Sequence, residues 1–350
     1  MRQALSANQK RGRRVVANKM NRFVMDGDLN LLKGKVASII GYGNQGQAQG
    51  TILRENGIEV IVGSIKDASW RQAEKDGFPV FEINEAVKRS DIALLLLPDE
   101  VAPSIYYEHI EREIKKKKHF VLDFASGYSM TYGCIKPVSN MDVVLVAPRM
   151  IGWGILDLHK NKKGYPVLLG VAQDASGKAW DYAKAIAKGI GAIGFPGGVV
   201  IKSSFREETF LDLLSEHTWV PTMTAAMRAY FDVVTEEYDA SPEAAILELY
   251  ASQELAEVAK SMAQIGMIEQ MRLHSRTSQY GQFTRAIRFY EQARESTRKE
   301  AADIWSGEFA KEWSHDQASG CEVLNRMWKM ARDSKLAQAE DRLYRILGRR

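Results

Sequence analysis

Cysteine is almost missing from this chain: among 350 residues only Cys134 and Cys321 occur, far apart and without CxxC spacing. This scarcity argues against a disulfide framework and against a cysteine-based metal site, and it suits a reducing cytoplasm. Long hydrophobic runs are missing too. The most apolar short run, residues 92–97, ends in Pro98 and is too brief to span a bilayer. We therefore expect a cytoplasmic protein with no membrane partner.

Acidic residues are absent from residues 1–25, where basic residues recur. Three interpretations of this N-terminal arm (residues 1–23) stay open: a disordered solubilising tail, a contact with an acidic partner, or an organelle-targeting peptide. The arm lacks the serine richness of a targeting peptide and the apolar core of a secretion signal. The formal net charge of the whole chain, +4, is small for this length, and we expect no nucleic-acid partner.

Residues 24–204 alternate short apolar runs with helical stretches. Such runs are typical of parallel strands covered on both faces, and repeated βα units predict a doubly wound Rossmann-like α/β sheet. The predicted strands are 36–40, 60–62, 92–97, 120–122, 143–146 and 167–171, and the helices include 45–56, 101–116 and 175–189.

Residues 205–350 contain long helical patterns and no convincing strand, so this part is predicted to be an all-α domain. Within the helix predicted at 242–265, Leu247, Tyr250, Glu254 and Val258 would share one face. The candidate helices are 206–219, 221–236, 242–265, 282–304 and 321–335.

A glycine-rich turn follows the first apolar run: Gly41-Tyr42-Gly43-Asn44-Gln45-Gly46. Gly41 allows a tight turn, Gly43 lets the backbone approach a pyrophosphate, and Gly46 allows close packing of strand and helix. The helix that follows points its positive end at the phosphates. Because the motif lies in the first βα unit, it predicts a bound dinucleotide. Pro98 is a further candidate cofactor contact.

The type of dinucleotide is less clearly marked. An acid at the end of the second strand would bind the ribose hydroxyls of NAD, but Gly63-Ser64 occupies that position. Asp67 lies slightly later and would repel the 2′-phosphate of NADP. Lys66, Ser64 and Ser69 could instead hold that phosphate. The balance leans narrowly towards NADH over NADPH.

Asp212 and Glu216 lie one helical turn apart in the first helix of the C-terminal region. Two carboxylates on one face can hold a cation beside a polarised carbonyl. The alternative is a solvated helix face, although like charges at this spacing are mildly unfavourable.

Several segments, in order along the chain, resemble the ketol-acid reductoisomerase family. The resemblance runs from residue 23 to the C-terminus, and it is specific because its motifs occur in sequence. The segments are Phe23 to Gly50, Leu96-Leu97-Pro98-Asp99-Glu100, Val146-Ala147-Pro148, Gln173 to Ala179, Ala187 to Gly191, Phe205-Arg206-Glu207-Glu208-Thr209 and Gly307 to Trp313.

The resemblance implies a Rossmann domain at 24–204 and a knotted helical domain at 205–350. The short form of the family builds its active site across an intertwined dimer, so we expect a homodimer or a higher homo-oligomer. The family isomerises 2-acetohydroxy acids with Mg²⁺ and then reduces the product with a nicotinamide cofactor.

Site residues can be carried over from the family one by one. Asp212 matches its bridging aspartate, and Glu216 matches the glutamate that follows. Glu254 matches a glutamate from the partner chain, and Ser275 matches a serine that contacts substrate. The implied metal ligands are therefore Asp212, Glu216 and Glu254.

Other positions depart from the family pattern at the reaction centre. Tyr250 stands where the family has a first partner-chain glutamate, and Ser126 stands in place of its histidine. Arg149 replaces the lysine after Ala-Pro, and Ile65 lies near the place of an arginine in the cofactor loop. The run Met150-Ile151-Gly152-Trp153-Gly154 replaces a Gly-Pro-Gly-His run.

These departures change the expected chemistry. Alkyl migration needs two hard cations, and a neutral phenol at position 250 removes one anionic ligand. One Mg²⁺ is possible, but a full two-metal site is not expected. The lost histidine removes a proton shuttle, which His217 could replace unless it is an ordinary helix-surface residue. Arg149 can orient a carboxylate but is a poor proton donor. Met150, Trp153, Trp219 and Tyr250 would either enlarge an apolar pocket or pack in the core.

Three hypotheses follow. The first is a reductase of the family, acting on a keto acid, a ketone or an imine, whose isomerase activity is lost or weakened. The second is a working ketol-acid reductoisomerase with an unusual site. The third is a dinucleotide-binding protein without turnover. An intact glycine turn beside an altered reaction centre fits the first and the third best, and of these we favour the first.

Overall fold

The structure, a computed structural model, describes residues 22–350. Most of the basic arm, with its three interpretations, lies outside the described residues. The chain divides into two compact units, and the boundary falls after Thr209. We call them the α/β unit and the helical unit.

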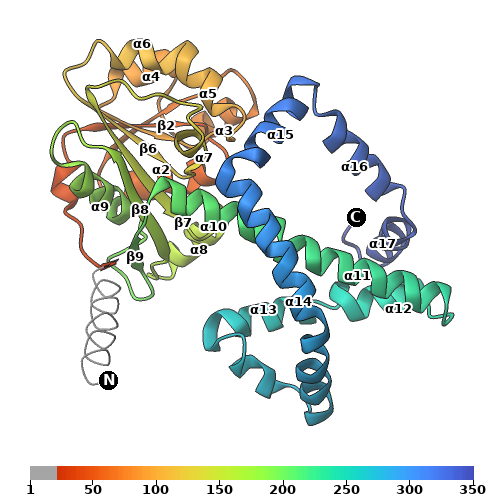
Figure 1. The fold of residues 1–350 in the computed structure, drawn as a ribbon. Helices are drawn as coiled ribbons and strands as arrows, with labels where there is room; N and C mark the ends of the chain where they lie inside the picture. The colour runs from red at the N-terminus through yellow and green to blue at the C-terminus, as the bar shows by residue number, and fades with distance from the viewer. Residues whose placement is uncertain (1–21) are drawn as a thin grey trace, which may run out of the picture. The chain divides into compact units, whose positions relative to one another are not determined.

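The α/β unit is built on a nine-stranded sheet in the order β1-β9-β8-β7-β6-β5-β2-β3-β4 (Figure 1). From β4 to β7 the six neighbouring strands are all parallel. This part has the strand order of the dinucleotide-binding fold. The order in which successive strands are added to the sheet reverses between β2 and β5, although the two strands are parallel. The strands are β1 (Phe23–Val24), β2 (Val36–Ile40), β3 (Glu59–Gly63), β4 (Val80–Phe81), β5 (Ile92–Leu95), β6 (Phe120–Phe124), β7 (Met141–Pro148), β8 (Pro166–Gln173) and β9 (Val199–Lys202).

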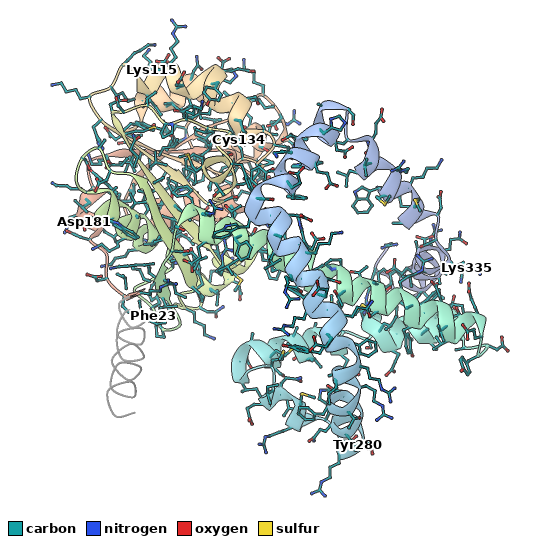
Figure 2. The ribbon with its side chains drawn as sticks, in the orientation of Figure 1. Phe23, Lys115, Cys134, Asp181, Tyr280 and Lys335 are labelled. Carbon is teal, nitrogen blue, oxygen red and sulfur yellow. The ribbon has the colours of Figure 1, made fainter. Side chains whose placement is uncertain are left out.

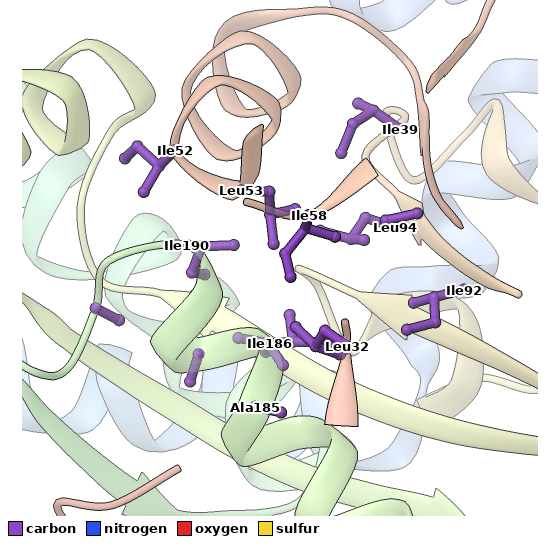
Figure 3. Close-up of a cluster of buried hydrophobic side chains, with 14 of the residues drawn as sticks. Leu32, Ile39, Ile52, Leu53, Ile58, Ile92, Leu94, Ala185, Ile186 and Ile190 are labelled. Carbon is purple, nitrogen blue, oxygen red and sulfur yellow. The ribbon is translucent and has the colours of Figure 1, made fainter. Parts of the chain in front are cut away.

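Both faces of this sheet are covered, because successive apolar side chains of a strand point to opposite sides. Ile39 of β2 and Leu94 of β5 belong to one core cluster, whereas Ile40 and Leu95 belong to the other. Figure 3 shows the first cluster, where residues of the sheet meet Ile52 and its neighbours on the covering helices. The predicted short apolar strands are confirmed.

Helices cover the two faces (Figure 1). The first core cluster contains residues of α2 (Asn44–Glu55), α3 (Ala68–Lys75), α8 (Gly152–Lys160) and α9 (Ala179–Gly189). The second contains residues of α4 (Ile83–Arg89), α5 (Ala102–Ile105), the π-helix η2 (Tyr106–Ile110) and α6 (Glu111–Ile114). Two shorter elements, η1 (Leu29–Leu31) and α7 (Tyr128–Thr131), complete the helices of this unit.

The doubly wound sheet that the sequence predicted is present, and it includes two antiparallel pairings. β8 pairs antiparallel with β7, and β1 pairs antiparallel with β9 at the edge. An apolar run marks a buried strand but carries no signal for its direction. The two-residue strands β1 and β4 are too short to give a periodic pattern, and they were not predicted.

The helical unit contains no strand among its described residues, as predicted. Its first helix, α10 (Phe205–His217), begins before the unit boundary. The others are α11 (Trp219–Glu236), α12 (Pro242–Ile246), the π-helix η3 (Leu247–Ala251), α13 (Glu254–Ile265), the 3-10 helix η4 (Glu269–Leu273), α14 (Arg276–Ser306), α15 (Glu308–Ala318), α16 (Glu322–Arg332) and α17 (Lys335–Ile346).

The single helix predicted at 242–265 is wrong. A π-helical turn ends at Ala251, and Gln253 then takes a left-handed backbone with φ of 73° before α13 begins at Glu254. Tyr250 and Glu254 therefore do not share a helix face. The apolar periodicity continues across the break, and for that reason the sequence pattern did not reveal it.

Little of the helical unit is buried within a single chain. Its core cluster joins Phe231 of α11 to Ala245, Ile246 and Ala251, and to Ala339 and Leu343 of α17. Along α14, large apolar side chains stay exposed: Tyr280, Phe283, Ile287, Phe289 and Tyr290. Figure 2 labels Tyr280 on this helix. None of the helices in residues 22–350 has the length and apolarity needed to cross a membrane.

Candidate active site

The glycine turn joins β2 to α2 in the conformation expected of a dinucleotide site. Gly41 has φ of +97°, and a Cβ there would lie 2.7 Å from the carbonyl oxygen of Leu96. A Cβ on Gly46 would lie 2.1 Å from the carbonyl oxygen of Gly41. A Cβ on Gly43 would meet nothing within 4 Å. Two glycines thus allow close packing, and the third leaves space for a ligand.

The amino end of α2 is open to an anion. Gly43 is the N-cap residue and supplies no side-chain hydrogen bond to the first turn. The N–H groups of Asn44 and its successors therefore point outward without a side-chain cap. Helix amino ends of this kind bind phosphate groups through these N–H groups and the helix dipole.

Two cavities flank this turn at the carboxyl ends of β2 and β5, where the strand order reverses. Open α/β sheets bind their ligands at such a switch point. The Ser126 cavity, of about 360 Å³, is lined by Gly43, Asn44, Gln45, Pro98, Asp99 and Ser126 among others. The Asp67 cavity, of about 260 Å³, is lined by Gly41, Tyr42, Ser64, Asp67, Ser69 and Pro98 among others.

In the Asp67 cavity, most of the residues predicted to bind cofactor come together. Asp67 is the N-cap of α3, and its carboxylate accepts a hydrogen bond of 3.1 Å from the backbone N of Trp70. Ser64 is almost fully buried. Lys66 and Ile65 line a neighbouring cavity with His109.

Tyr42 can offer a cofactor little beyond its backbone. Its side chain is buried, and its hydroxyl donates to the carboxylate of Asp76 at 2.9 Å. Burial, with this acidic partner, raises the pKa of Tyr42 well above its ordinary value. The sequence motif alone could not tell backbone from side-chain participation.

Ser126 lies at the carboxyl end of β6 and lines the other cavity. Its hydroxyl donates to Oδ2 of Asp99 at 3.2 Å and accepts from the backbone N of Tyr128 at 3.3 Å. A serine hydroxyl does not exchange protons near neutral pH as an imidazole does. At this position the chain can offer hydrogen bonds, but no strong base.

Beside Ser126, an ion pair between Arg149 and the buried Glu208 fixes the loop. Glu208, only 2% exposed, accepts a hydrogen bond of 2.7 Å from the guanidinium of Arg149 and one of 2.7 Å from the backbone N of Gly127. In the sequence Glu208 stands within the motif Phe205-Arg206-Glu207-Glu208-Thr209, and no role was predicted for it. Its position one turn before Asp212 on α10 was the available signal.

The segment after Arg149 is tied to the glycine turn. The side-chain amide of Gln45 donates to the carbonyl of Met150 at 2.9 Å, and the backbone N of Trp153 donates to the side chain of Asn44 at 3.0 Å. The Trp153 side chain is 67% exposed, and that of Trp219 is 59% exposed. Core packing of these two tryptophans within the single chain is therefore excluded.

Asp212 and Glu216 lie one turn apart on α10, as the sequence requires. Across residues 22–350, the structure brings together no group of three or more potential metal ligands, so Glu254 does not join them within one chain. His217 is not an ordinary surface residue. Its ring meets Phe309 edge-on at 4.3 Å between centroids, and Nδ1 lies 3.9 Å from Glu300.

The three residues expected to bind substrate, two of them assigned to the partner chain, lie in separate elements. The Tyr250 hydroxyl donates to Glu340 of α17 at 2.6 Å, and burial, aided by this carboxylate, raises the pKa of Tyr250 well above its ordinary value. Glu254 begins α13. Ser275 is the N-cap of α14 and accepts from the backbone N of Ser278 at 3.2 Å.

Comparison with known proteins covers both units. Residues 31–195 match the family model "Acetohydroxy acid isomeroreductase, NADPH-binding domain", and residues 205–348 match "Ketol-acid reductoisomerase, C-terminal domain". "Putative ketol-acid reductoisomerase 3" of Saccharolobus solfataricus is 56% identical, over 95% of this chain and 99% of its own length. "Ketol-acid reductoisomerase (NADP(+))" of Methanopyrus kandleri is 36% identical, over 92% and 97% of the two chains.

A solved structure resembles the whole chain. It is an "NADH-preferring ketol-acid reductoisomerase from an uncultured archean", with a TM-score of 0.84, 28% identity, and coverage of 93% of this chain and 98% of the other. The glycine turn and the two cavities at the switch point agree with these matches. The chain belongs to the ketol-acid reductoisomerase family and is an NAD(P)-dependent oxidoreductase.

Proposed function

We propose that this chain is a reductase of a keto acid, a ketone or an imine, in which the rearrangement typical of its family is lost or weakened. The observation that carries this proposal is the state of Tyr250. Its phenol is half-buried and donates to Glu340 at 2.6 Å, so it is held as a neutral hydrogen-bond donor. A neutral donor cannot replace an anionic oxygen ligand of Mg²⁺.

The charge balance explains why this matters more for rearrangement than for reduction. Alkyl migration requires charge to be drawn onto two substrate oxygens at once, which two hard cations achieve together. Asp212 and Glu216, one turn apart on α10, would hold a single Mg²⁺, and that ion would supply polarisation of one carbonyl. One polarised carbonyl is enough for hydride addition.

The surroundings of Ser126 also favour reduction over rearrangement. Removing a hydroxyl proton, the first event of the rearrangement, needs a base near neutrality. Ser126 offers a hydroxyl, and the positive charge of Arg149 lies against Glu208. These groups can bind and orient a carboxylate or carbonyl group, but they are poor proton acceptors.

The cofactor of this proposal is a nicotinamide dinucleotide, with NADH preferred. The fit rests on the open position at Gly43 and on the uncapped first turn of α2, which would hold the pyrophosphate. Asp67 would accept hydrogen bonds from a ribose and would repel a 2′-phosphate. When bound, the reduced nicotinamide supplies the hydride. The solved relative is described as NADH-preferring, although several curated relatives carry NADP(+) in their names.

The active unit of this proposal is a homodimer or a higher homo-oligomer. The exposed apolar side chains of α14 support it, because contiguous apolar surface of this kind marks protein contacts. In such an assembly a second copy would supply Tyr250 and Glu254 to the site.

A genuine ketol-acid reductoisomerase is the second candidate. It is favoured by the 36% identity to curated enzymes of that name over most of the chain. It is also favoured by the retained Asp212 and Glu216. In that case two Mg²⁺ ions would bind in the site, although Tyr250 stands in place of an anionic ligand.

One assay separates these candidates. The purified protein is mixed with NADH or NADPH, with and without Mg²⁺, and oxidation of the cofactor is followed with 2-acetolactate, with a 3-hydroxy-2-keto acid and with a cyclic imine. Turnover of the keto acid or the imine, with little turnover of 2-acetolactate, is the expected result. Efficient consumption with 2-acetolactate would establish the second candidate. Tight cofactor binding without turnover of any substrate would contradict both.

A further inference from the structure

A separate polar cavity lies at the amino ends of the parallel strands, whereas the cofactor turn lies at their carboxyl ends. Lys35 immediately precedes β2, Asp91 precedes β5 and His119 precedes β6, so these residues meet where the amino ends of three parallel strands lie together. The cavity measures about 340 Å³ and is lined by Lys35, Asp91, Lys117, Lys118, His119, Val121 and Tyr182. We call it the amino-edge cavity. A five-residue strand places it roughly 16 Å from the glycine turn.

Positive charge exceeds negative charge in this cavity. Within residues 22–350, neither Lys35 nor Lys118 forms an ion pair with an acidic side chain. Lys117 donates to the carbonyl oxygens of Lys88 at 2.9 Å and of Ser90 at 2.7 Å, which leaves one ammonium N–H for another acceptor. Partial burial lowers the pKa of Lys117. The one acid, Asp91, already accepts from the backbone N of Val36 at 3.0 Å.

His119 is held in place by a buried carboxylate. Asp142 is fully buried and accepts from the backbone N of Ala175 at 2.7 Å, from the N and Oγ of Ser176 at 2.9 and 2.6 Å, and from Nε2 of His119 at 3.0 Å. Nε2–H therefore points at Asp142, and Nδ1 is the ring nitrogen left for a ligand.

An aromatic ring completes the cavity wall. The ring of Tyr182 stacks against His119 with 6.0 Å between centroids, and Lys35 Nζ lies 5.9 Å from the centre of the same ring. Tyr182 thus contacts both Lys35 and His119 from one side. Several oriented N–H donors around a walled space form an arrangement suited to a compact anion.

The neighbouring lysines show what an ordinary surface arrangement looks like in the same run. Lys115 pairs with Glu111 at 3.0 Å, and Lys116 pairs with Glu113 at 2.6 Å, both within one helical turn. Figure 2 labels Lys115, which directly follows α6. Lys117 and Lys118, which follow directly, line the cavity instead. Two lysines of this run thus pair with acids of α6, and the two that follow line the cavity.

We propose that the amino-edge cavity binds a small oxyanion, either a phosphate group or a dicarboxylate, at a site separate from the cofactor site. Lys35, Lys118 and the free N–H of Lys117 would neutralise its charge. His119, oriented by Asp142, would donate from Nδ1–H to an oxygen of the ligand in its doubly protonated form. Asp91 would reject more heavily charged ligands that fill the whole space.

The test uses the full-length protein and isothermal titration with inorganic phosphate, at an ionic strength held constant with chloride. The wild type is compared with the double variant Lys35→Met/Lys118→Met and with the control Lys115→Met/Lys116→Met. Both variants remove two positive charges, but only the first removes them from the cavity. The expected result is saturable binding by the wild type, at least about 10-fold weaker binding by the cavity variant, and less than about 2-fold change in the control.

Equal weakening in both variants would overturn the proposal, since the effect would then be one of general charge. So would an absence of saturable binding of both phosphate and succinate by the wild type. A parallel titration with succinate identifies the ligand class. The anion that binds the wild type more tightly, phosphate or succinate, should be the one whose binding the cavity variant weakens. NADH affinity should stay unchanged in all variants, which separates this test from that of the proposed function. Thermal unfolding without phosphate checks that the cavity variant folds, and the single variant Lys118→Met replaces it if it does not.

Discussion

Single residues around the Ser126 cavity are held by internal pairs before any ligand arrives. Glu208 joins the loop after β6 to the guanidinium of Arg149, and both contacts measure 2.7 Å. The buried position of Glu208 means that either contact, once lost, leaves a desolvated group behind. We therefore expect Glu208 to be a positioning residue for Ser126 and Gly127.

The change Glu208→Gln should lower the free energy of unfolding by roughly 2 kcal/mol, because it removes the charge that pairs with Arg149. The matched control is Glu207→Gln. Glu207 pairs with Arg22 at 3.1 Å, but its side chain is 39% exposed, so its loss should cost under about 1 kcal/mol. Urea titration of the two variants compares these costs. Equal destabilisation would mean that the buried pair contributes no more than an exposed one.

Asp67 governs the choice of dinucleotide in this account. The change Asp67→Asn keeps an N-cap for α3, since asparagine caps helices as well as aspartate does, and it removes only the charge. Affinity for NADPH should rise about 10-fold relative to NADH. Asp28→Asn is the control, because Asp28 also caps a helix but lies outside the Asp67 cavity. Fluorescence titration with both cofactors measures the ratio. An unchanged ratio in Asp67→Asn would remove Asp67 from the cofactor site.

Among the elements, the break between η3 and α13 has the largest consequence for the site. Gln253 adopts the left-handed region at φ of 73°, which is costly for a residue with a Cβ atom. Because of this break, Glu254 does not lie on the same helix face as Tyr250. Tyr250 and Glu254, the two positions where the family has glutamates, are therefore in different elements.

Gln253→Gly should stabilise the protein by about 1 kcal/mol, since glycine takes a left-handed backbone without strain. The same replacement inside α13, Ala263→Gly, should instead destabilise by about 1 kcal/mol. Opposite shifts of the melting temperature are the expected result. A loss of stability in both variants would indicate that the Gln253 side chain has a role its backbone does not reveal.

Much of the architecture could be predicted from the sequence at this scale. The apolar runs of the sheet and the glycine turn at Gly41 depend on local pattern, and the structure contains them. The break at Gln253, the antiparallel β8 and the short strands β1 and β4 depend on contacts between distant segments, which periodicity does not encode. For the same reason the motif gave Glu208 no role, because its partners Arg149 and Gly127 are far away in sequence.

For the whole molecule, the single chain leaves an apolar stripe uncovered on α14. Tyr280, Phe283, Ile287 and Tyr290 recur at helical spacing, and all are exposed. We expect a second copy of the chain to cover this stripe. The expectation follows from the family resemblance as well as from the exposed area.

Ile287→Asp should shift the protein towards the monomer, because it places a charge in the centre of the stripe. The control Gln292→Asp makes the same change of charge on another face of α14. Sedimentation of both variants at equal concentration reports the assembly state. If Ile287→Asp sediments like the wild type, the stripe does not form the contact.

The central claim is that reduction persists where rearrangement is impaired by Tyr250. The most direct measurement is the ratio of kcat/KM for 2-acetolactate to kcat/KM for the isomerised 3-hydroxy-2-keto acid, at saturating Mg²⁺ and NADH. The account predicts a ratio below about 0.01 for the wild type, since loss of one metal ligand and of a general base each costs orders of magnitude in rate. It also predicts a rise in this ratio, together with tighter Mg²⁺ binding, in Tyr250→Glu. A wild-type ratio near unity would contradict the account.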